Sequence, residues 1–167
     1  DGKEIDATGY KFIVKEDTNE ILSCMSTDYK LVSNQEVIDK SLPHIEKKGG
    51  VLTECKTFGN GARTSWTFQF KDFPMDIHGE ELYPQINIRN SYDGSTTIGV
   101  LGGIYRLICS NGAIIGRIMK EHSERHSIWN TKISNGYIGK MVNDTLDNME
   151  SVFTKEFPIL FNSNVND

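Results

Sequence analysis

A strict two-residue alternation between Arg63 and Lys71 is the feature that most constrains the fold. Three aromatic residues alternate there with polar ones, Trp66, Phe68 and Phe70 against Ser65, Thr67, Gln69 and Lys71. Successive side chains of a strand point to opposite faces of a sheet, so this pattern predicts a strand with one buried face and one polar face. The segment from Leu82 to Asn90 repeats the pattern, with Ile86 and Ile88 against Gln85, Asn87 and Arg89.

Turn signals between the apolar segments predict that most strands pair as antiparallel hairpins. Glycine and asparagine tolerate the positive φ of tight turns, and they occur at Gly59-Asn60-Gly61, Asp93-Gly94 and Asn111-Gly112. A polar turn cluster also separates Tyr10–Lys15 from Glu20–Ser26. We further predict strands over Val51–Thr57, Thr96–Leu101, Ile104–Cys109 and Ala113–Ile118, with a helix as the alternative for the last. The glycine-rich run ending at Gly103 is interpreted as a bulge or bend, not a phosphate-binding loop.

Two segments have helical periodicity. Ser33 and Glu36 form a capping box before a stripe made by Ile38, Leu42 and Ile45, and Gly49-Gly50 supplies the stop. Pro43 lies within that stripe and predicts a kink or a split. From Gly136 to Glu156, apolar residues recur every three or four positions, which predicts an amphipathic helix.

Together these elements predict an α+β fold, mostly antiparallel β-sheet built from hairpins, with an early helix and a long C-terminal amphipathic helix. We expect one domain over residues 1–161 and a flexible polar tail over residues 162–167. The 37% apolar and 25% charged residues are typical of a globular protein. No apolar run approaches the length of a membrane span.

The cysteines and the first residues of the chain indicate which cellular compartment to expect. Cys24, Cys55 and Cys109 are odd in number and far apart, which disfavours a disulfide framework and a zinc ribbon. We therefore expect buried free thiols and a reducing cytoplasm. The chain begins with acidic and polar residues, has no starting Met and shows no signal-peptide pattern, so we expect a domain taken from a longer protein.

The net charge of −5 hides an uneven distribution. Between Leu101 and Lys140 there are six Lys or Arg residues and two Glu, a local charge of +4. Cationic side chains bind phosphates and aromatic rings stack on bases, so the polar sheet face and this segment predict a site for DNA, single-stranded in the main hypothesis and duplex as the alternative partner. The predicted phosphate contacts are Lys71, Arg89, Arg106, Arg117, Arg125 and Lys132, and the predicted stacking residues are Tyr105 and Trp129. The alternatives are a solvated face with scattered charge and aromatic residues that only fill the core.

Catalytic and metal-binding patterns are weak in this sequence. His122 and His126 would share one side of a helix, but the residues between them match no zinc-protease motif. Cys109, His126 and Asn111 are the residue types of thiol catalysis, yet Cys109 ends an apolar strand, where a thiol is usually inert. Residues 90–95 hold one carboxylate, too few for a calcium loop, and are interpreted as a turn. The sequence therefore indicates no cofactor and no metal and leans away from an enzyme.

Several sequence blocks, met in order along the chain, carry a resemblance. They are Gly9-Tyr10-Lys11, Glu16-Asp17-Thr18, Asp28-Tyr29-Lys30-Leu31-Val32, Asn90-Ser91-Tyr92-Asp93-Gly94-Ser95, Arg106-Leu107-Ile108-Cys109-Ser110-Asn111-Gly112 and Arg125-His126-Ser127. Over roughly residues 9 to 128, the chain resembles the DUF932 family of phage- and plasmid-encoded proteins. The motif residues are Asn90, Asp93, Gly94, Cys109, Asn111 and His126.

The resemblance implies a mobile-element protein in the cytoplasm of a bacterial host, with a lean toward DNA replication or recombination. It supplies no catalytic residues. The competing hypothesis is a non-catalytic protein-interaction module that acts on a host or phage protein, or that forms a homo-oligomer. Neither hypothesis involves a membrane.

Overall fold

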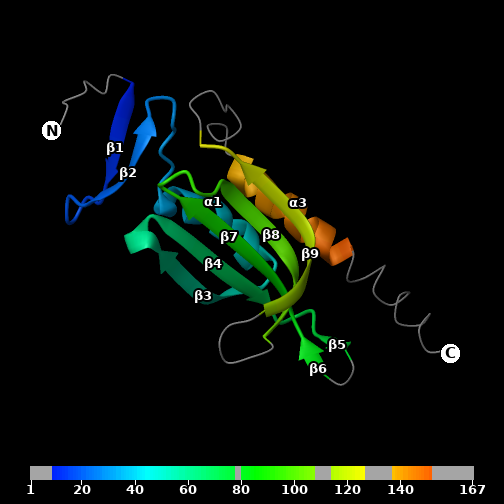
Figure 1. Ribbon diagram of the computed structural model, residues 1–167. Coiled ribbons are helices and arrows are strands. Elements are labelled where there is room, and N and C mark those ends of the chain that lie inside the picture. The colour runs from blue at the N-terminus through cyan, green and yellow to red at the C-terminus, as the bar shows by residue number, and fades with distance from the viewer. Residues whose placement is uncertain (1–8, 78–79, 108–113, 127–136, 152–167) are drawn as a thin grey trace.

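A computed structural model describes residues 9–77, 80–107, 114–126 and 137–151, and the side chains of residues 75–82 and 104–122 are not described (Figure 1). The fold is α+β, as predicted. The chain order of the described elements is β1 (Tyr10–Val14), β2 (Ile21–Ser26), α1 (Asn34–Lys47), β3 (Gly50–Phe58), a 3-10 turn η1 (Gly59–Gly61), β4 (Arg63–Phe70), β5 (Met75–Ile77), β6 (Glu80–Leu82), β7 (Pro84–Ser91), β8 (Ile98–Leu107), β9 (Ile114–Glu124) and α3 (Tyr137–Ser151).

The central feature is a five-stranded antiparallel sheet in the order β3-β4-β7-β8-β9. Its register follows from the alternation in the sequence, because Trp66 lies opposite Ile88 and Phe68 lies opposite Ile86. Directly opposed residues of an antiparallel pair share a face, so the aromatic residues of β4 and the isoleucines of β7 form one apolar surface. The pairs β1–β2 and β5–β6 are separate two-stranded ribbons.

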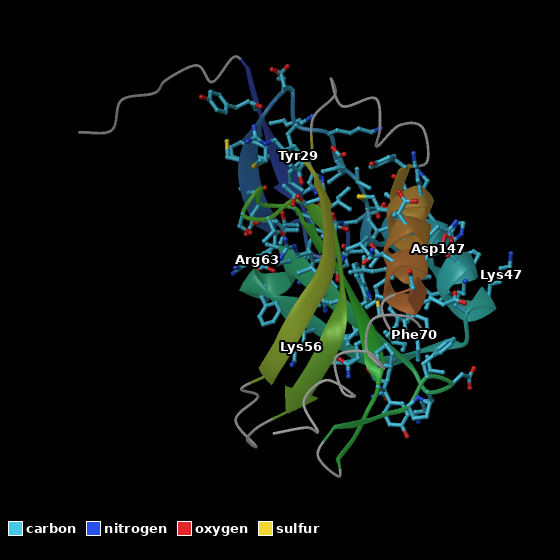
Figure 2. The ribbon with its side chains drawn as sticks, turned by 90° about the vertical axis from the view of Figure 1, so that its right-hand side faces the viewer. Tyr29, Lys47, Lys56, Arg63, Phe70 and Asp147 are labelled. Atoms are coloured by element: carbon cyan, nitrogen blue, oxygen red, sulfur yellow. The ribbon has the colours of Figure 1, made fainter. Side chains whose placement is uncertain are left out.

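Both described helices pack on the apolar face of this sheet, and the opposite face carries no helix among the described residues (Figures 1 and 2). The core lies between these two layers. It contains Val32, Val37, Ile45, Trp66, Phe68, Phe70, Ile86, Ile88, Ile98, Val100, Ile138, Met141, Val142 and Leu146. On α3, the buried Ile138, Met141 and Val142 contrast with the exposed Lys140 and Asp144.

Helix α1 begins at the predicted cap and ends just before the predicted stop at Gly49-Gly50. The hydroxyl of Ser33 accepts a hydrogen bond from the backbone N–H of Glu36 at 3.0 Å, which makes Ser33 the N-cap. The helix does not split at Pro43, because it runs from Asn34 to Lys47 as one element. Packing of Val37 and Ile45 against the sheet on either side of the proline holds both halves to the same core.

The glycine-rich region in β8 agrees with the prediction in part. Residues 98–107 form one strand, where the sequence suggested two strands separated by Gly102-Gly103. The predicted bulge is confirmed, because the pairing of β8 with β9 shifts register between Gly102 and Gly103. Gly102 lies beneath α3, and a Cβ there would come within 2.6 Å of the Thr145 methyl group. The absence of a side chain at Gly102 therefore lets α3 approach the sheet closely.

The ribbon formed by β1 and β2 stands beyond one end of the sheet (Figure 1). Its inner face is attached to the β7–β8 turn, since the Ser23 hydroxyl donates to the Tyr92 carbonyl oxygen at 2.5 Å. Its outer face leaves Tyr10, Phe12 and Ile21 largely exposed. The prediction of buried thiols is wrong for Cys24 on this ribbon and for Cys55 on β3, because both are exposed. Cys24 lies opposite Phe12 on the outer face of the ribbon, and Cys55 lies opposite Trp66 on the edge strand of the sheet.

Among the described residues, neither helix is both long and apolar enough to cross a membrane.

Candidate nucleic-acid interface

The candidate interface is the helix-free face of the sheet, and its centre lies on β4 and β7. Three cross-strand pairs form this centre, namely Ser65–Arg89, Thr67–Asn87 and Gln69–Gln85. All six side chains are half-buried, between the fully buried residues that alternate with them on the other face. We call these six residues the polar face. It contains one cation, five neutral hydrogen-bonding groups and no carboxylate.

A hydrogen-bond network orders the middle of the polar face. The Asn87 amide donates to the Ser65 hydroxyl at 2.8 Å and to the Thr67 hydroxyl at 3.1 Å. It also lies 3.3 Å from the Trp66 carbonyl oxygen. Neutral amides and hydroxyls of this kind both donate and accept hydrogen bonds. They can therefore bind the edges of different bases without preference for one nucleotide sequence.

The neighbouring strand β8 continues this face with Gly99, Leu101 and Gly103, and Leu101 lies opposite Asn87. Gly99 lies opposite Arg89, and Gly103 lies opposite Gln85. A Cβ at Gly99 would approach the Arg89 Nε within 2.6 Å, so the Arg89 side chain lies across the glycine. Gly99 therefore leaves room for the Arg89 side chain, whereas Leu101 places an apolar side chain, 9% exposed, next to Asn87.

The margins of the interface carry charges of both signs. Lys56 on β3 pairs with Glu54 at 2.7 Å, and Arg63 on β4 lies 3.7 Å from a carboxylate oxygen of Asp93. Figure 2 shows Lys56 and Arg63 on the sheet layer and Lys47 and Asp147 on the helical layer. These marginal cations are therefore partly neutralised, and Arg89 is the cation of the centre.

The predicted phosphate contacts do not all lie together. Arg89 is on the polar face, whereas Lys71 is exposed just beyond the end of β4. Arg125 is exposed just after β9, whose residue Glu124 pairs with Ile98 at the other end of the sheet. Lys71 and Arg125 thus flank the sheet at opposite ends.

The remaining predicted contacts are placed only in part. Arg106 pairs with Ile115, Arg117 pairs with Ile104 and Tyr105 pairs with Gly116, so their backbones lie on the β8–β9 ladder. Their side chains are not described. Cys109, Asn111, Trp129 and Lys132 lie outside the described residues. These seven residues remain sequence predictions.

Three of the motif blocks that are distant in the sequence meet at one end of the sheet. The Asn90 amide donates to the Val32 carbonyl oxygen at 3.0 Å and to the Asn34 Oδ1 at 2.9 Å. The Tyr29 hydroxyl donates to the Ser91 carbonyl oxygen at 2.7 Å, and the His126 ring stacks on the Tyr29 ring. We call this set the motif cluster, consisting of Tyr29, Val32, Asn34, Asn90, Ser91 and His126.

The motif at Asp93-Gly94 is a turn that borders this cluster. Gly94 has a φ of +68°, and the Asp93 carboxylate accepts a hydrogen bond from the Ser95 N–H at 2.9 Å. Burial raises the pKa of Asp93, but hydrogen bonds from Ser95 and the nearby Arg63 outweigh it, so the pKa is lowered overall. The carboxylate therefore stays ionised and caps the turn.

Burial shifts the titration of two members of the motif cluster. It lowers the pKa of His126 against a smaller opposing effect from the Lys30 carbonyl oxygen, and it raises the pKa of Tyr29. His126 Nδ1 lies 3.2 Å from that carbonyl, so Nδ1 carries the proton of the neutral ring. The buried His126 Nε2 and Asn90 Oδ1 have no hydrogen-bond partner in the part of the chain that the structure describes.

The two histidines whose spacing suggested a metal site do not lie on a helix. His122 lies on β9 and His126 follows the end of that strand, so the two do not share a helix face. Within the described ranges there is no group of three His, Cys, Asp or Glu residues placed to hold a metal ion.

The role of Asn34 and Thr64 in this region was missed by the sequence reasoning. The Asn34 amide donates to the Thr64 hydroxyl at 2.9 Å, and its backbone N–H donates to the Tyr92 hydroxyl at 2.7 Å. The only local signal was the position of Asn34 directly after the helix cap. Its partners are at least 30 residues away in sequence, so no local pattern indicates them.

Fold and site define a two-layer α+β domain that has an open polar sheet face and a cluster of motif residues at one end of the sheet. The family model described as "Domain of unknown function (DUF932)" matches residues 21–155, and the chain belongs to this family. No solved structure matches the chain.

Proposed function

We propose that this protein binds single-stranded DNA on the polar face of its sheet, as a phage- or plasmid-encoded accessory protein of DNA replication or recombination in the bacterial cytoplasm. The observation that carries the proposal is the composition of a helix-free sheet face. Its two central strands present one arginine and five neutral hydrogen-bonding side chains, and no carboxylate, in a protein with a net charge of −5. Phosphate groups can approach this face without meeting an acidic side chain at its centre.

The shape of the face favours a single strand over a duplex. Reading a duplex requires a helix or ribbon that enters a groove, whereas unstacked bases can lie on a flat sheet. On this face Gly99 leaves room for the Arg89 side chain to lie along the sheet. The amides of Gln69, Gln85 and Asn87 would contact base edges, and Arg89 would contact a phosphate.

A charge-insertion experiment tests the location of the site. The double substitution Gln69→Glu with Gln85→Glu adds two carboxylates to the polar face with almost no change in shape. We expect roughly tenfold weaker binding of a labelled oligonucleotide in fluorescence anisotropy, because the new charges repel phosphate. The matched control, Asn143→Asp with Asn148→Asp, adds the same charge on α3, in the helical layer.

The two variants separate a local effect from a general one. Near wild-type affinity in the α3 control, together with the loss on the polar face, supports the site. Equal losses of affinity in both variants would show that binding depends only on net charge and would exclude the polar face as the binding site.

A second candidate function is binding of a host or phage protein through the β1–β2 ribbon. Tyr10, Phe12 and Ile21 are each more than 60% exposed on its outer face, together with Val14 at 47%. Large apolar side chains gathered on one face often mark a protein interface. A cleft of about 400 Å³ between the ribbon, α1 and β4 also separates the ribbon from the sheet.

Capture of a partner from host cells with wild-type protein, but not with Phe12→Ser, would support this second function if the complex resists high salt. A Phe12→Ser variant that captures the same protein would exclude the ribbon as the interface. DNA binding is expected to be unchanged in Phe12→Ser, so the two candidate functions are tested separately.

A further inference from the structure

Strand β3 forms an edge of the five-stranded sheet, and no described strand pairs with its outer side. It is nine residues long, and every residue after Gly50 is exposed. Long exposed edges present unpaired backbone groups and pair readily with another strand unless something protects them. A bulge between Leu52 and Glu54 interrupts the regular pairing near the start of β3, so regular backbone extends from Glu54 to Phe58.

The sequence of this regular segment is complementary to itself. Glu54 and Lys56 flank Cys55, point to the same face and form an ion pair within one chain. If two copies of β3 pair antiparallel about a two-fold axis at Cys55, Glu54 of each copy lies opposite Lys56 of the other. The four charges then alternate in sign around the axis, so each carboxylate has two ammonium neighbours.

Neighbouring registers lack this complementarity. An axis at Glu54 places two glutamates opposite each other, and an axis at Lys56 places two lysines opposite each other, which is destabilising in both cases. An axis midway between two residues would place a side chain of one face opposite a side chain of the other face, which a regular antiparallel ladder does not allow. Charge complementarity therefore selects one register, the one centred on Cys55.

An apolar groove at the same edge adds area to such a contact. It has a volume of about 450 Å³ and is lined by Ile38 and Leu42 of α1, Leu52 of β3, and Trp66 and Phe68 of β4. Leu52 is half exposed beside it. A strand added to β3 lies along the opening of this groove, so pairing would remove apolar surface from water as well as form backbone hydrogen bonds.

We propose that β3 is a homodimer interface, in which a second copy of this chain pairs antiparallel with β3 in the register that places Cys55 opposite Cys55. The two five-stranded sheets then form one continuous sheet, and the two polar faces lie side by side. Glu54 and Lys56 lie opposite Thr67 and Ser65 at the margin of the polar face, so this proposal is tested by oligomeric state and cross-linking and not by DNA binding.

Charge reversals at the edge test the register. Glu54→Lys and Lys56→Glu each place like charges opposite one another twice, so we expect each variant to dimerise at least about tenfold more weakly than wild type. The double variant Glu54→Lys with Lys56→Glu restores opposite pairs at the original net charge and should restore the dimer. A mixture of the two single variants should form a heterodimer. Sedimentation velocity over a concentration series up to the millimolar range measures all four.

Oxidative cross-linking gives a second readout. In the proposed register the two Cys55 Cα atoms are about 4.5–5.5 Å apart, which is within the range of a disulfide. Mild oxidation of the wild-type chain should give a Cys55–Cys55 peptide by mass spectrometry, well in excess of Cys24–Cys24. Cys24 is the matched control because it is also an exposed thiol on a strand.

Three results would overturn the proposal. They are a wild-type chain that stays monomeric across the concentration series, a double variant that fails to regain the dimer although it is folded, and oxidation that links Cys24 as readily as Cys55. A monomer in solution would assign the β3 edge to a different protein or to no partner. Circular dichroism of each variant distinguishes lost dimerisation from unfolding.

Discussion

The imidazole ring of His126 stacks on the phenol ring of Tyr29, with 5.1 Å between the ring centroids and 11° between the ring planes. This contact joins the segment after β2 to the segment after β9, which are almost 100 residues apart in sequence. Tyr29 also donates to the Ser91 carbonyl oxygen, so the same ring connects to the end of β7. The motif cluster therefore holds three distant parts of the chain together.

The buried His126 predicts a stability that depends on pH. Its pKa is lowered in the folded state, so the unfolded chain binds the proton more tightly. The free energy of unfolding should be highest above the unfolded pKa of about 6.5 and should fall as the pH drops through that value toward the folded pKa. Urea unfolding at pH 7.5 and pH 5.5, which are roughly one pH unit on either side of that value, measures the loss.

A His126→Gln variant is the control for this pH effect. It has no ionisable ring, so its unfolding free energy should change less between the two pH values than that of wild type. The same pH dependence in both proteins would show that other groups cause it.

Asn90 is expected to be a structural residue at the motif cluster. It is 1% exposed, and its amide joins Val32 to Asn34. We expect Asn90→Ala to lower the free energy of unfolding by about 2 kcal/mol, because the buried Val32 carbonyl oxygen and the half-buried Asn34 Oδ1 both lose a donor. Asn143→Ala, at a half-buried position on α3, should change it by less than about 0.5 kcal/mol in denaturant titrations. Similar effects of the two substitutions would contradict a special role for Asn90.

Two glycines of β8 should differ in their tolerance of a methyl group. A Cβ at Gly102 would meet the Met149 sulfur and come within 2.6 Å of the Thr145 methyl group, both on α3, whereas a Cβ at Gly99 would come within 2.6 Å of Nε of the flexible Arg89 side chain alone. We expect Gly102→Ala to destabilise the fold by about 1–3 kcal/mol and Gly99→Ala to have a smaller effect. Thermal unfolding of both variants provides the comparison, and equal melting temperatures would mean that α3 does not require the close approach.

Much of the fold could be predicted from local pattern. The alternation through Trp66, Phe68 and Phe70 determines which face of β4 is buried, and it correctly separated the polar face from the core. The hairpin turn at Asp93-Gly94 and the cap at Ser33 could also be predicted, because each depends on neighbours only two or three residues away. Hydrogen bonds between residues this close in the chain can be predicted directly from the sequence.

What could not be predicted depends on contacts between distant residues. Gly102-Gly103 predicted a boundary between two strands, but residues 98–107 form one strand that pairs with β7 on one side and with β9 on the other. Cys55 looked like a buried thiol, yet it lies on a sheet edge, and edge position is a property of the strand order. The motif cluster has the same origin, since His126 meets Tyr29 only after the sheet has formed.

The DNA account predicts separate contributions from the two ends of the sheet. Lys71 and Arg125 are both exposed and flank the sheet at opposite ends. We expect Lys71→Glu and Arg125→Glu each to weaken oligonucleotide binding and to reduce the slope of log affinity against log salt by about 1. Lys140→Glu, which makes the same charge change on α3, should leave the slope unchanged. A loss that is equal in all three variants would indicate an effect of net charge alone.

The most direct test of the central claim is fluorescence anisotropy of a labelled single-stranded oligonucleotide, and of its duplex, with the wild-type protein over a series of salt concentrations. The account predicts micromolar or tighter binding of the single strand, weaker binding of the duplex, and an affinity that falls steeply as salt is raised. No binding of the single strand at low salt would contradict the account and would leave the β1–β2 ribbon as the candidate functional surface.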